Sequence, residues 1–276
     1  MNYDTFLTAQ DILTPARSEA VSSSSSQITA LGNDQMIEFI YSLNLNFLLA
    51  AHTRHHAKGW SWMKKTYAFN TYSHNSLSAA ISAGAATFAL TSATNWDSTG
   101  RSVIETAKGA LDFVDHSSKS SNTLTVSTAS GAETVSLAHS TNRVHKLYPV
   151  ASDYGRVHNL WVNSREYRYD KFNGVFPNPC SFTTYGDFFF FPRGMYEADV
   201  TLLYEKKHSD ITLLTSTTNI PREFLRYAVE MTLAHLFMVK RRRSDMPTSI
   251  QLAEIELERA LMFDSTQSTS NSLRLA

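Results

Sequence analysis

The chain has a single cysteine, Cys180, among its 276 residues, so no disulfide can form within it. Folds stapled by disulfides are thereby excluded, and we expect the protein to be made in a reducing compartment. Charge is also scarce, because 18% of the residues are Asp, Glu, Lys or Arg, where a typical soluble chain has about 25%. Lys plus Arg and Asp plus Glu both number 25. This balance disfavours a general nucleic-acid binder, whose surface would be basic.

Long apolar runs are missing as well. No stretch approaches the roughly 18 apolar residues of a membrane span, and the first residues lack the pattern of a signal peptide. We therefore expect a soluble chain with no membrane partner. Hydrophobic residues nevertheless make up 42% of the sequence and aromatic residues 12%, which is ample for the core of one large domain or two modest ones.

Helical periodicity dominates the N-terminal segment, residues 1–75. Thr8 or Thr14 can cap a first helix, and the serines at 22–26 interrupt it, because hydroxyls compete for backbone hydrogen bonds. A second helix starts at Asn33 or Asp34 and continues to about residue 58. Its apolar residues recur at spacings of three and four: Met36, Ile37, Ile40, Tyr41, Leu43, Phe47 and Leu48. Residues 60–69 alternate large apolar with smaller or polar side chains and predict a strand.

The next segment, residues 76–148, reads as a β-hairpin insertion. Ser and Thr occupy 25 of the 73 positions from 73 to 145. Short strand-like runs at 87–91, 101–106, 111–114, 123–126 and 144–148 are separated by Asn, Asp, Ser and Gly, which are turn formers.

An aromatic β-rich segment follows at residues 149–215. Four consecutive phenylalanines, Phe188 to Phe191, alternate between the two faces of a strand, so both faces must be covered. We expect the core on one side and a neighbouring element or subunit on the other. A further strand is expected at 196–204.

Residues 216–264 predict two closing helices, the first begun by Ile220, Pro221 and Arg222. The second, ending near Phe263, has two apolar stripes. Ile250, Ala253, Leu257 and Leu261 form one, and Leu252, Ile255 and Met262 lie nearly opposite. One stripe can serve the subunit's own core, so the other predicts a subunit interface. Residues 265–276 form a polar tail too weakly hydrophobic to fold alone. The predicted fold class is α+β, a helical bundle with a β-rich insertion and an aromatic β-rich segment.

Catalytic and metal-binding patterns are weak throughout. His52, His55 and His56 share a helical face at a spacing that can hold zinc, but no carboxylate or cysteine stands at ligand spacing nearby. His235 falls within an apolar stripe and reads as a core histidine, and Cys180 as a structural thiol. The carboxylate pairs Glu254 with Glu258 and Asp112 with Asp115 suit a glycosidase in principle. No phosphate-binding glycine motif occurs. We predict no catalytic residue, metal or cofactor.

The one concentrated charge is the basic run Lys240, Arg241, Arg242 and Arg243. Four cations at a helix end can meet DNA phosphates, acidic residues of a neighbouring subunit, or solvent.

The order of these features resembles the head-to-tail adaptor, or connector, proteins of tailed bacteriophages. The resemblance rests on the tryptophan-rich stretch Trp60-Ser61-Trp62-Met63-Lys64-Lys65 and on the helix start Ile220-Pro221-Arg222-Glu223-Phe224. The insertion adds the phrases at 86–96, 100–105 and 121–125, which look like a hairpin module of phage virion proteins.

The resemblance implies a structural virion protein and not an enzyme. Such adaptors form a homo-oligomeric ring, usually of twelve subunits, under the portal protein, and they receive a tail or nozzle protein below. The protein would then assemble in the host cytoplasm, end at the head-tail neck of the virion, and line part of the DNA conduit. The resemblance makes Leu273, Arg274 and Leu275 a portal-docking tail. Non-specific contact with packaged DNA is implied for the basic run.

Two other readings stay open from the sequence. Some adaptors double as a virion-associated cell-wall hydrolase, although no residue pattern here indicates which carboxylates would act. The aromatic β segments also suit a host-attachment or glycan-binding tail component.

Overall fold

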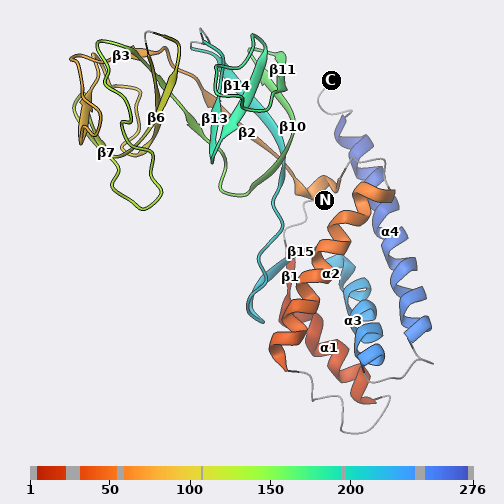
Figure 1. The fold of residues 1–276 in the computed structure, drawn as a ribbon. Helices are drawn as coiled ribbons and strands as arrows, with labels where there is room; N and C mark the ends of the chain where they lie inside the picture. The colour runs from red at the N-terminus through yellow and green to blue at the C-terminus, as the bar shows by residue number, and fades with distance from the viewer. Residues whose placement is uncertain are drawn as a thin grey trace. The chain divides into compact units, whose positions relative to one another are not determined.

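The structure is a computed structural model of the whole chain. It describes residues 5–22, 32–54, 59–106, 108–193, 195, 197–239 and 246–272, and the side chains of 21–22 and 265–272 are outside the description. Helices and strands are mixed, as an α+β fold requires (Figure 1). The chain divides into two compact units, which we call the helical unit (Met1–Lys65 with Glu205–Ala276) and the β unit (Thr66–Tyr204).

The helical unit contains the described helices α1, α2, α3 and α4 and one short strand pair. Its elements are β1 (Phe6–Thr8), α1 (Ala9–Ser22), α2 (Asn33–Arg54), the 3-10 helix η2 (Ser61–Met63), β15 (Thr217–Pro221), the 3-10 helix η3 (Arg222–Phe224), α3 (Leu225–Val239) and α4 (Met246–Ser272). Strands β1 and β15 pair antiparallel. Thr8 begins α1, because its hydroxyl accepts the Asp11 N–H at 3.2 Å while the Asp11 carboxylate accepts the Thr8 N–H at 2.9 Å.

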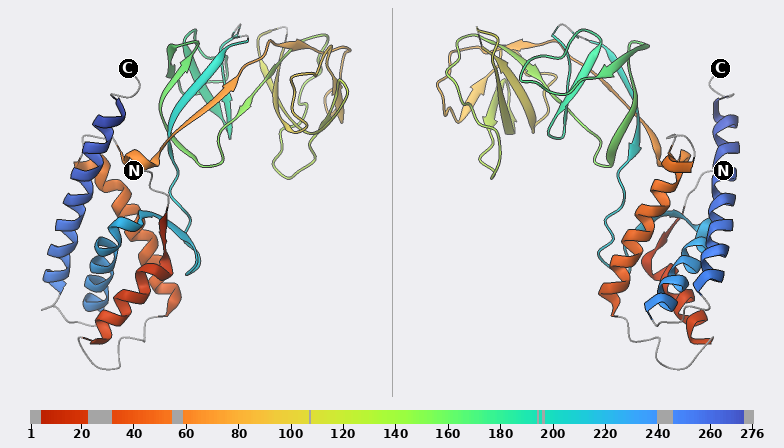
Figure 2. Two further views of the ribbon diagram at one scale, coloured as in Figure 1. Left: turned by 180° about the vertical axis from the view of Figure 1, so that it is seen from behind. Right: turned by 45° about the vertical axis from the view of Figure 1, so that its right-hand side comes forward.

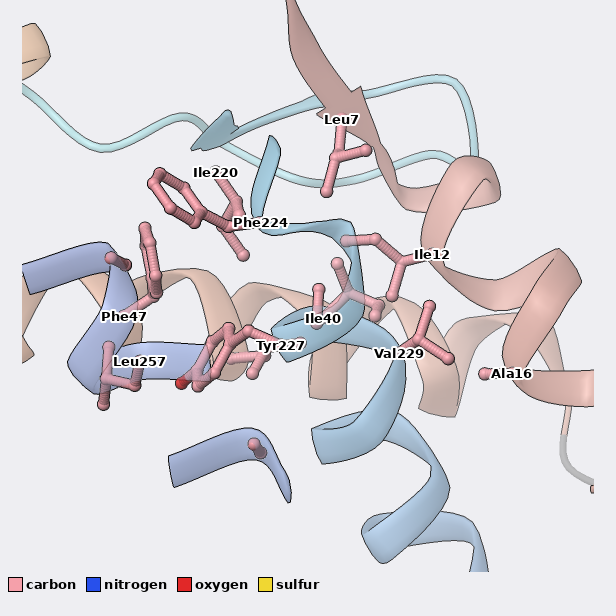
Figure 3. Packing of buried hydrophobic residues seen from close by; sticks show 14 of the residues in the cluster. Leu7, Ile12, Ala16, Ile40, Phe47, Ile220, Phe224, Tyr227, Val229 and Leu257 are labelled. Carbon is pink, nitrogen blue, oxygen red and sulfur yellow. The ribbon is translucent and has the colours of Figure 1, made fainter. Parts of the chain in front are cut away.

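One hydrophobic core joins all four of these helices (Figure 3). Phe47 of α2 stacks on Trp60 with ring centroids 4.8 Å apart, and the Trp60 indole donates to the Phe47 carbonyl at 2.9 Å. A buried amide pair ties α2 to β15: Asn44 Nδ2 donates to Asn219 Oδ1 at 3.1 Å, and the Asn219 N–H donates to Asn44 Oδ1 at 2.7 Å. These bonds satisfy polar groups that burial would otherwise leave unpaired.

Three predicted boundaries in this unit were wrong. The strand expected from residue 60 begins at Lys64, because Ser61–Met63 form a 3-10 turn whose Ser61 N–H donates to both carboxylate oxygens of Asp264 at 3.1 Å. Ile220 and Pro221, expected to open a helix, end strand β15 instead. Helix α4 runs to Ser272, beyond the predicted end near Phe263.

The β unit contains a six-stranded sheet that curls until its edges meet. The strand order is β3 (Asn75–Ser76), β8 (Arg143–Lys146), β5 (Gly100–Glu105), β6 (Leu111–Ser120), β7 (Thr123–Val126) and β4 (Thr87–Ala89). A bridge between Leu77 and Leu90, the residues that directly follow β3 and β4, links the two edges of the sheet. The enclosed core includes Phe88, Val114, Leu124 and Val144.

A seven-stranded sheet forms the rest of this unit. Its order is β2 (Lys64–Asn70), β14 (Asp199–Lys206), β10 (Tyr154–Val162), β11 (Arg165–Tyr169), β12 (Ser181–Tyr185), β13 (Phe188–Phe190) and β9 (Tyr148–Pro149). The pair β11–β12 is parallel. The further strand expected at 196–204 corresponds to β14, which begins at Asp199.

The run of four phenylalanines is covered on both faces from within the β unit. Phe189 and Phe191 belong to the core of the seven-stranded sheet. Phe190, on the other face, packs with Val103, Phe113 and Leu147 of the six-stranded region, and Phe188 lies against this second cluster. No neighbouring subunit is needed here, because the two sheets supply both cores.

Candidate functional site

The predicted interface stripe lies on the solvent side of α4. Ala253, Leu257 and Leu261 are buried in the helical core. Ile255 is two residues from Ala253 and from Leu257, which places it about 200° around the helix from either. Its exposed fraction is 51%, and that of Met262 is 67%. We call Leu252, Ile255 and Met262, of which Leu252 is half-buried, the outer α4 face.

Charged side chains frame the outer α4 face. Arg54 of α2 binds Glu258 at 2.6 Å, and Arg259 binds Glu256 at 2.7 Å with the Arg259 side chain 70% exposed. A shallow depression of about 580 Å³ is lined by Arg54, Gln251, Glu254, Ile255, Arg259 and Met262. Exposed ion pairs of this kind add at most about 1 kcal/mol to folding, so they contribute little to the stability of the helical unit.

A second, smaller groove lies between α2 and α4. It holds about 350 Å³, and its walls include Leu49 and Ala50 of α2 and Ile250 of α4. Tyr227 and Met231 of α3 also line it, and Leu49 is 47% exposed. The exposed apolar surface of the helical unit therefore extends from the outer α4 face toward α2.

The β unit joins the exposed Ser136 to two buried side chains, Asp112 and His139, an arrangement that the sequence analysis missed. Oδ2 of Asp112 lies 2.7 Å from Nε2 of His139, and the Ser136 hydroxyl donates to Oδ1 of Asp112 at 2.5 Å. The backbone N–H groups of Ser136 and Leu137 also donate to this carboxylate. In a catalytic triad the histidine stands between serine and carboxylate, whereas here the carboxylate stands between the other two. The arrangement fixes the 136–139 loop on strand β6.

The second carboxylate of β6 belongs to a separate ion pair. Asp115 receives two hydrogen bonds from Arg101, at 2.6 and 2.7 Å, and one from the Glu133 N–H at 2.9 Å. Burial acts to raise the pKa of Asp115, but these bonds outweigh it and hold the pKa below its ordinary value. Asp112 and Asp115 are three residues apart on one strand, so they point to opposite faces. They do not form the carboxylate pair that a glycosidase uses.

A cavity of about 620 Å³ opens beside this ion pair. Its lining includes Arg101, Asp115, His116, Lys146, Ser130 and Phe188. Lys146 binds Asp97 at 2.8 Å, so two cations face two carboxylates. Burial lowers the pKa of His116 and keeps the imidazole neutral near pH 7. The cavity is therefore polar without net charge.

The histidines of the helical unit have structural partners. His52 Nε2 lies 3.0 Å from Glu205 Oε1, and both pack against Gly59, where an added Cβ would come within 3.0 Å of the His52 ring. His235 stacks on Phe39 with centroids 3.9 Å apart, and burial lowers the pKa of this histidine. His55 and His56 lie outside the described residues.

The remaining candidates are placed as follows. Cys180 is a half-buried free thiol at a positive φ of 65°, and Glu254 is exposed on α4. The basic run 240–243 and the docking residues Leu273, Arg274 and Leu275 lie outside the described residues. Within the ranges that the structure describes, no three His, Cys, Asp or Glu side chains are grouped as metal ligands. Over the same ranges, no helix has the length and hydropathy of a membrane span.

No model of a protein family matches the chain, and a search of the curated proteins finds no match. The candidate site therefore rests on the geometry of this molecule.

Proposed function

We propose that the protein is a structural adaptor subunit of a tailed-phage virion. Copies would form a ring between the portal protein and the tail or nozzle, around the DNA conduit. The observation that carries the proposal is the exposure of Ile255 on the face of α4 opposite the buried Ala253 and Leu257. A large aliphatic side chain half in water on an otherwise well-packed helix is typical of an assembly surface.

The charge balance agrees with a conduit wall. A net charge of zero avoids the strong, salt-dependent retention of DNA that a cationic lining would cause during packaging and ejection. Under this proposal the basic run 240–243 faces either the DNA or acidic groups of a neighbour. Leu273 and Leu275 would anchor the C-terminal tail on the portal, and Arg274 would pair with an acidic site there.

The test is to locate the chain in particles. Electron microscopy of purified virions should show a ring of copies at the head-tail neck, and deleting the coding sequence should leave filled heads without tails. Virions that lack the chain, or deletion particles whose heads still carry tails, would end the proposal.

A second candidate is glycan binding by the β unit, as part of host attachment. The observation that favours it is the 620 Å³ cavity, whose paired charges and hydroxyl-bearing lining suit a neutral, hydroxyl-rich ligand. Titration of the full chain with host cell-surface oligosaccharides should then show saturable binding that Ser130→Trp, at the cavity wall, removes. Absence of binding at millimolar oligosaccharide excludes this candidate and leaves the first unaffected.

A further inference from the structure

The outer α4 face needs a matching surface, and the helical unit presents one candidate in the loop between β14 and β15. This loop, residues 207–216, which we call the Leu213 loop, places Leu213 with 62% of its surface exposed. Two other apolar residues of the loop pack on the helical core: Ile211 is buried, and Leu214 is partly buried. One leucine of the loop is therefore directed outward while those beside it are packed.

The Leu213 loop is held in one conformation by hydrogen bonds. The N–H groups of Thr212 and Leu213 donate to the Ser216 hydroxyl at 3.2 and 3.0 Å, and the Ser216 N–H donates back to the Leu213 carbonyl at 3.0 Å. The start of α1 fastens the loop, because the Gln10 N–H donates to the Leu214 carbonyl at 2.9 Å. A preorganised loop loses little entropy when it binds, so Leu213 is suited to act as an anchor.

The loop and the outer α4 face lie on opposite sides of the helical unit. In Figure 1 and in both views of Figure 2, α4 runs along one side and the loop beside β15 lies along the other, with α2 and α3 between them. Two different patches on opposite sides of one subunit allow each copy to bind two neighbours. Such a head-to-tail contact repeats around a ring, whereas a patch that binds itself stops at a dimer.

The two surfaces also match in chemistry. Leu213 offers an aliphatic side chain to the depression that contains Ile255. Asp210, three residues before Leu213, is exposed and makes no ion pair among the residues described. Arg259, one helical turn after Ile255, has a side chain 70% exposed, and its Nη1 binds Glu256 of the same helix at 2.7 Å. In a contact between two copies, Asp210 beside Leu213 would meet Arg259 beside Ile255 and share its guanidinium with Glu256, and this would fix the direction of pairing.

We propose that the occupant of the outer α4 face is a second copy of this chain, whose Leu213 seats beside Ile255 while its Asp210 pairs with Arg259. The inference rests on the proposed ring and names the two halves of its interface. The alternative occupant, the outer α4 face of another copy, would give symmetric dimers.

Cysteine cross-linking distinguishes these arrangements. In a Cys180→Ser background, full-length Leu213→Cys and Ile255→Cys chains are mixed, oxidised mildly, and separated on non-reducing gels. We expect a cross-linked dimer in the mixture and none with either variant alone, and the double variant should give a ladder of covalent oligomers. Ser42→Cys, at an exposed position on α2, is the matched control and should not cross-link to Leu213→Cys.

Cross-linking of Ile255→Cys with itself, or of Leu213→Cys equally well with Ser42→Cys, would overturn the inference. A charge exchange gives an independent readout. Asp210→Arg or Arg259→Asp alone should weaken self-association about tenfold, and the two together should restore it. If the double variant does not restore self-association, Asp210 does not pair with Arg259.

Microscopy of the same particles separates this inference from the proposed function. If a neck ring forms but Leu213→Cys and Ile255→Cys do not cross-link, the proposed function stands and the proposed contact is wrong. A specific cross-link in a chain that enters no particle keeps the contact and overturns the function. If the chain neither cross-links nor joins a particle, both are wrong.

Discussion

Oδ2 of Asp112 lies 2.7 Å from Nε2 of His139, and both side chains are almost fully buried in the β unit. The same carboxylate accepts the N–H groups of Ser136 and Leu137, so it is the centre of a polar network that holds the 136–139 loop on strand β6. A buried acceptor of this kind is costly to replace by a group that cannot accept as many bonds.

Asp112→Asn should therefore destabilise the chain by about 2–3 kcal/mol, because the new amide N–H₂ opposes backbone donors. Urea unfolding followed by tryptophan fluorescence measures the change. Asp187→Asn, at an exposed position, is the control and should stay within about 0.5 kcal/mol of the unsubstituted chain. A loss for Asp112→Asn no larger than that of the control would contradict the structural role of the network.

A second prediction concerns pH. Burial lowers the pKa of His145 to about 3, with smaller contributions from the nearby His74, Arg193 and Arg143. The ordinary pKa of histidine, about 6.5, applies in the unfolded chain, so that chain binds the proton first as pH falls. Stability should then decline as pH drops from about 6.5 toward 3, since the unfolded state holds more protons in this window.

His145→Gln removes that titration. Between pH 7 and pH 4.5 the variant should lose about 2–3 kcal/mol less stability than the unsubstituted chain, as measured by urea unfolding at each pH. In the folded protein, the ring signals of His145 should show no titration above pH 4 by NMR. A normal titration near pH 6.5 would be incompatible with the burial.

The two stripes of α4 give a third prediction. Ile255→Glu should change the free energy of unfolding by less than about 0.5 kcal/mol, because the side chain is already half in water, yet it should block ring assembly. Leu257→Glu, two residues away, buries a charge and should cost about 3 kcal/mol or more. Unfolding curves and analytical ultracentrifugation separate the two effects. If Ile255→Glu lowers the free energy of unfolding as much as Leu257→Glu does, Ile255 belongs to the core.

A fourth prediction tests the docking tail. Deleting residues 273–276 should leave stability unchanged, since the last described core contact of α4 is made by Asp264, which binds Ser61. The shortened chain should no longer join the portal in a co-sedimentation assay with purified portal rings. Normal co-sedimentation would remove the role assigned to Leu273, Arg274 and Leu275.

Local pattern predicted much of the secondary structure. The spacing of Met36, Ile40 and Phe47 indicated the buried face of α2, and the strand expected at 123–126 is β7. The opposed stripes of α4 were also visible, because a single helix of known period fixes which residues share a face.

Tertiary contacts account for the errors. Trp60 and Trp62 alternate as strand residues do, yet they pack on Phe47, and the turn between them is fixed by Asp264, which comes 203 positions after Ser61. The network of Asp112, Ser136 and His139 left no signal either, since its members meet only when the loop between β7 and β8 packs on β6. No spacing rule connects a strand residue to a histidine 27 positions later.

Strands β2 and β14, through which the chain enters and leaves the β unit, are neighbours in one sheet. The whole of Thr66–Tyr204 is thus an insertion into the sequence of the helical unit, and the chain enters and leaves it through these two paired strands. The core of the helical unit contains residues from before and after the insertion. An insertion joined at two adjacent strands can be lengthened, shortened or replaced while the core of the helical unit stays intact. Under the proposed function, changes within this insertion would alter the surface of the β unit and leave the outer α4 face and the Leu213 loop unchanged.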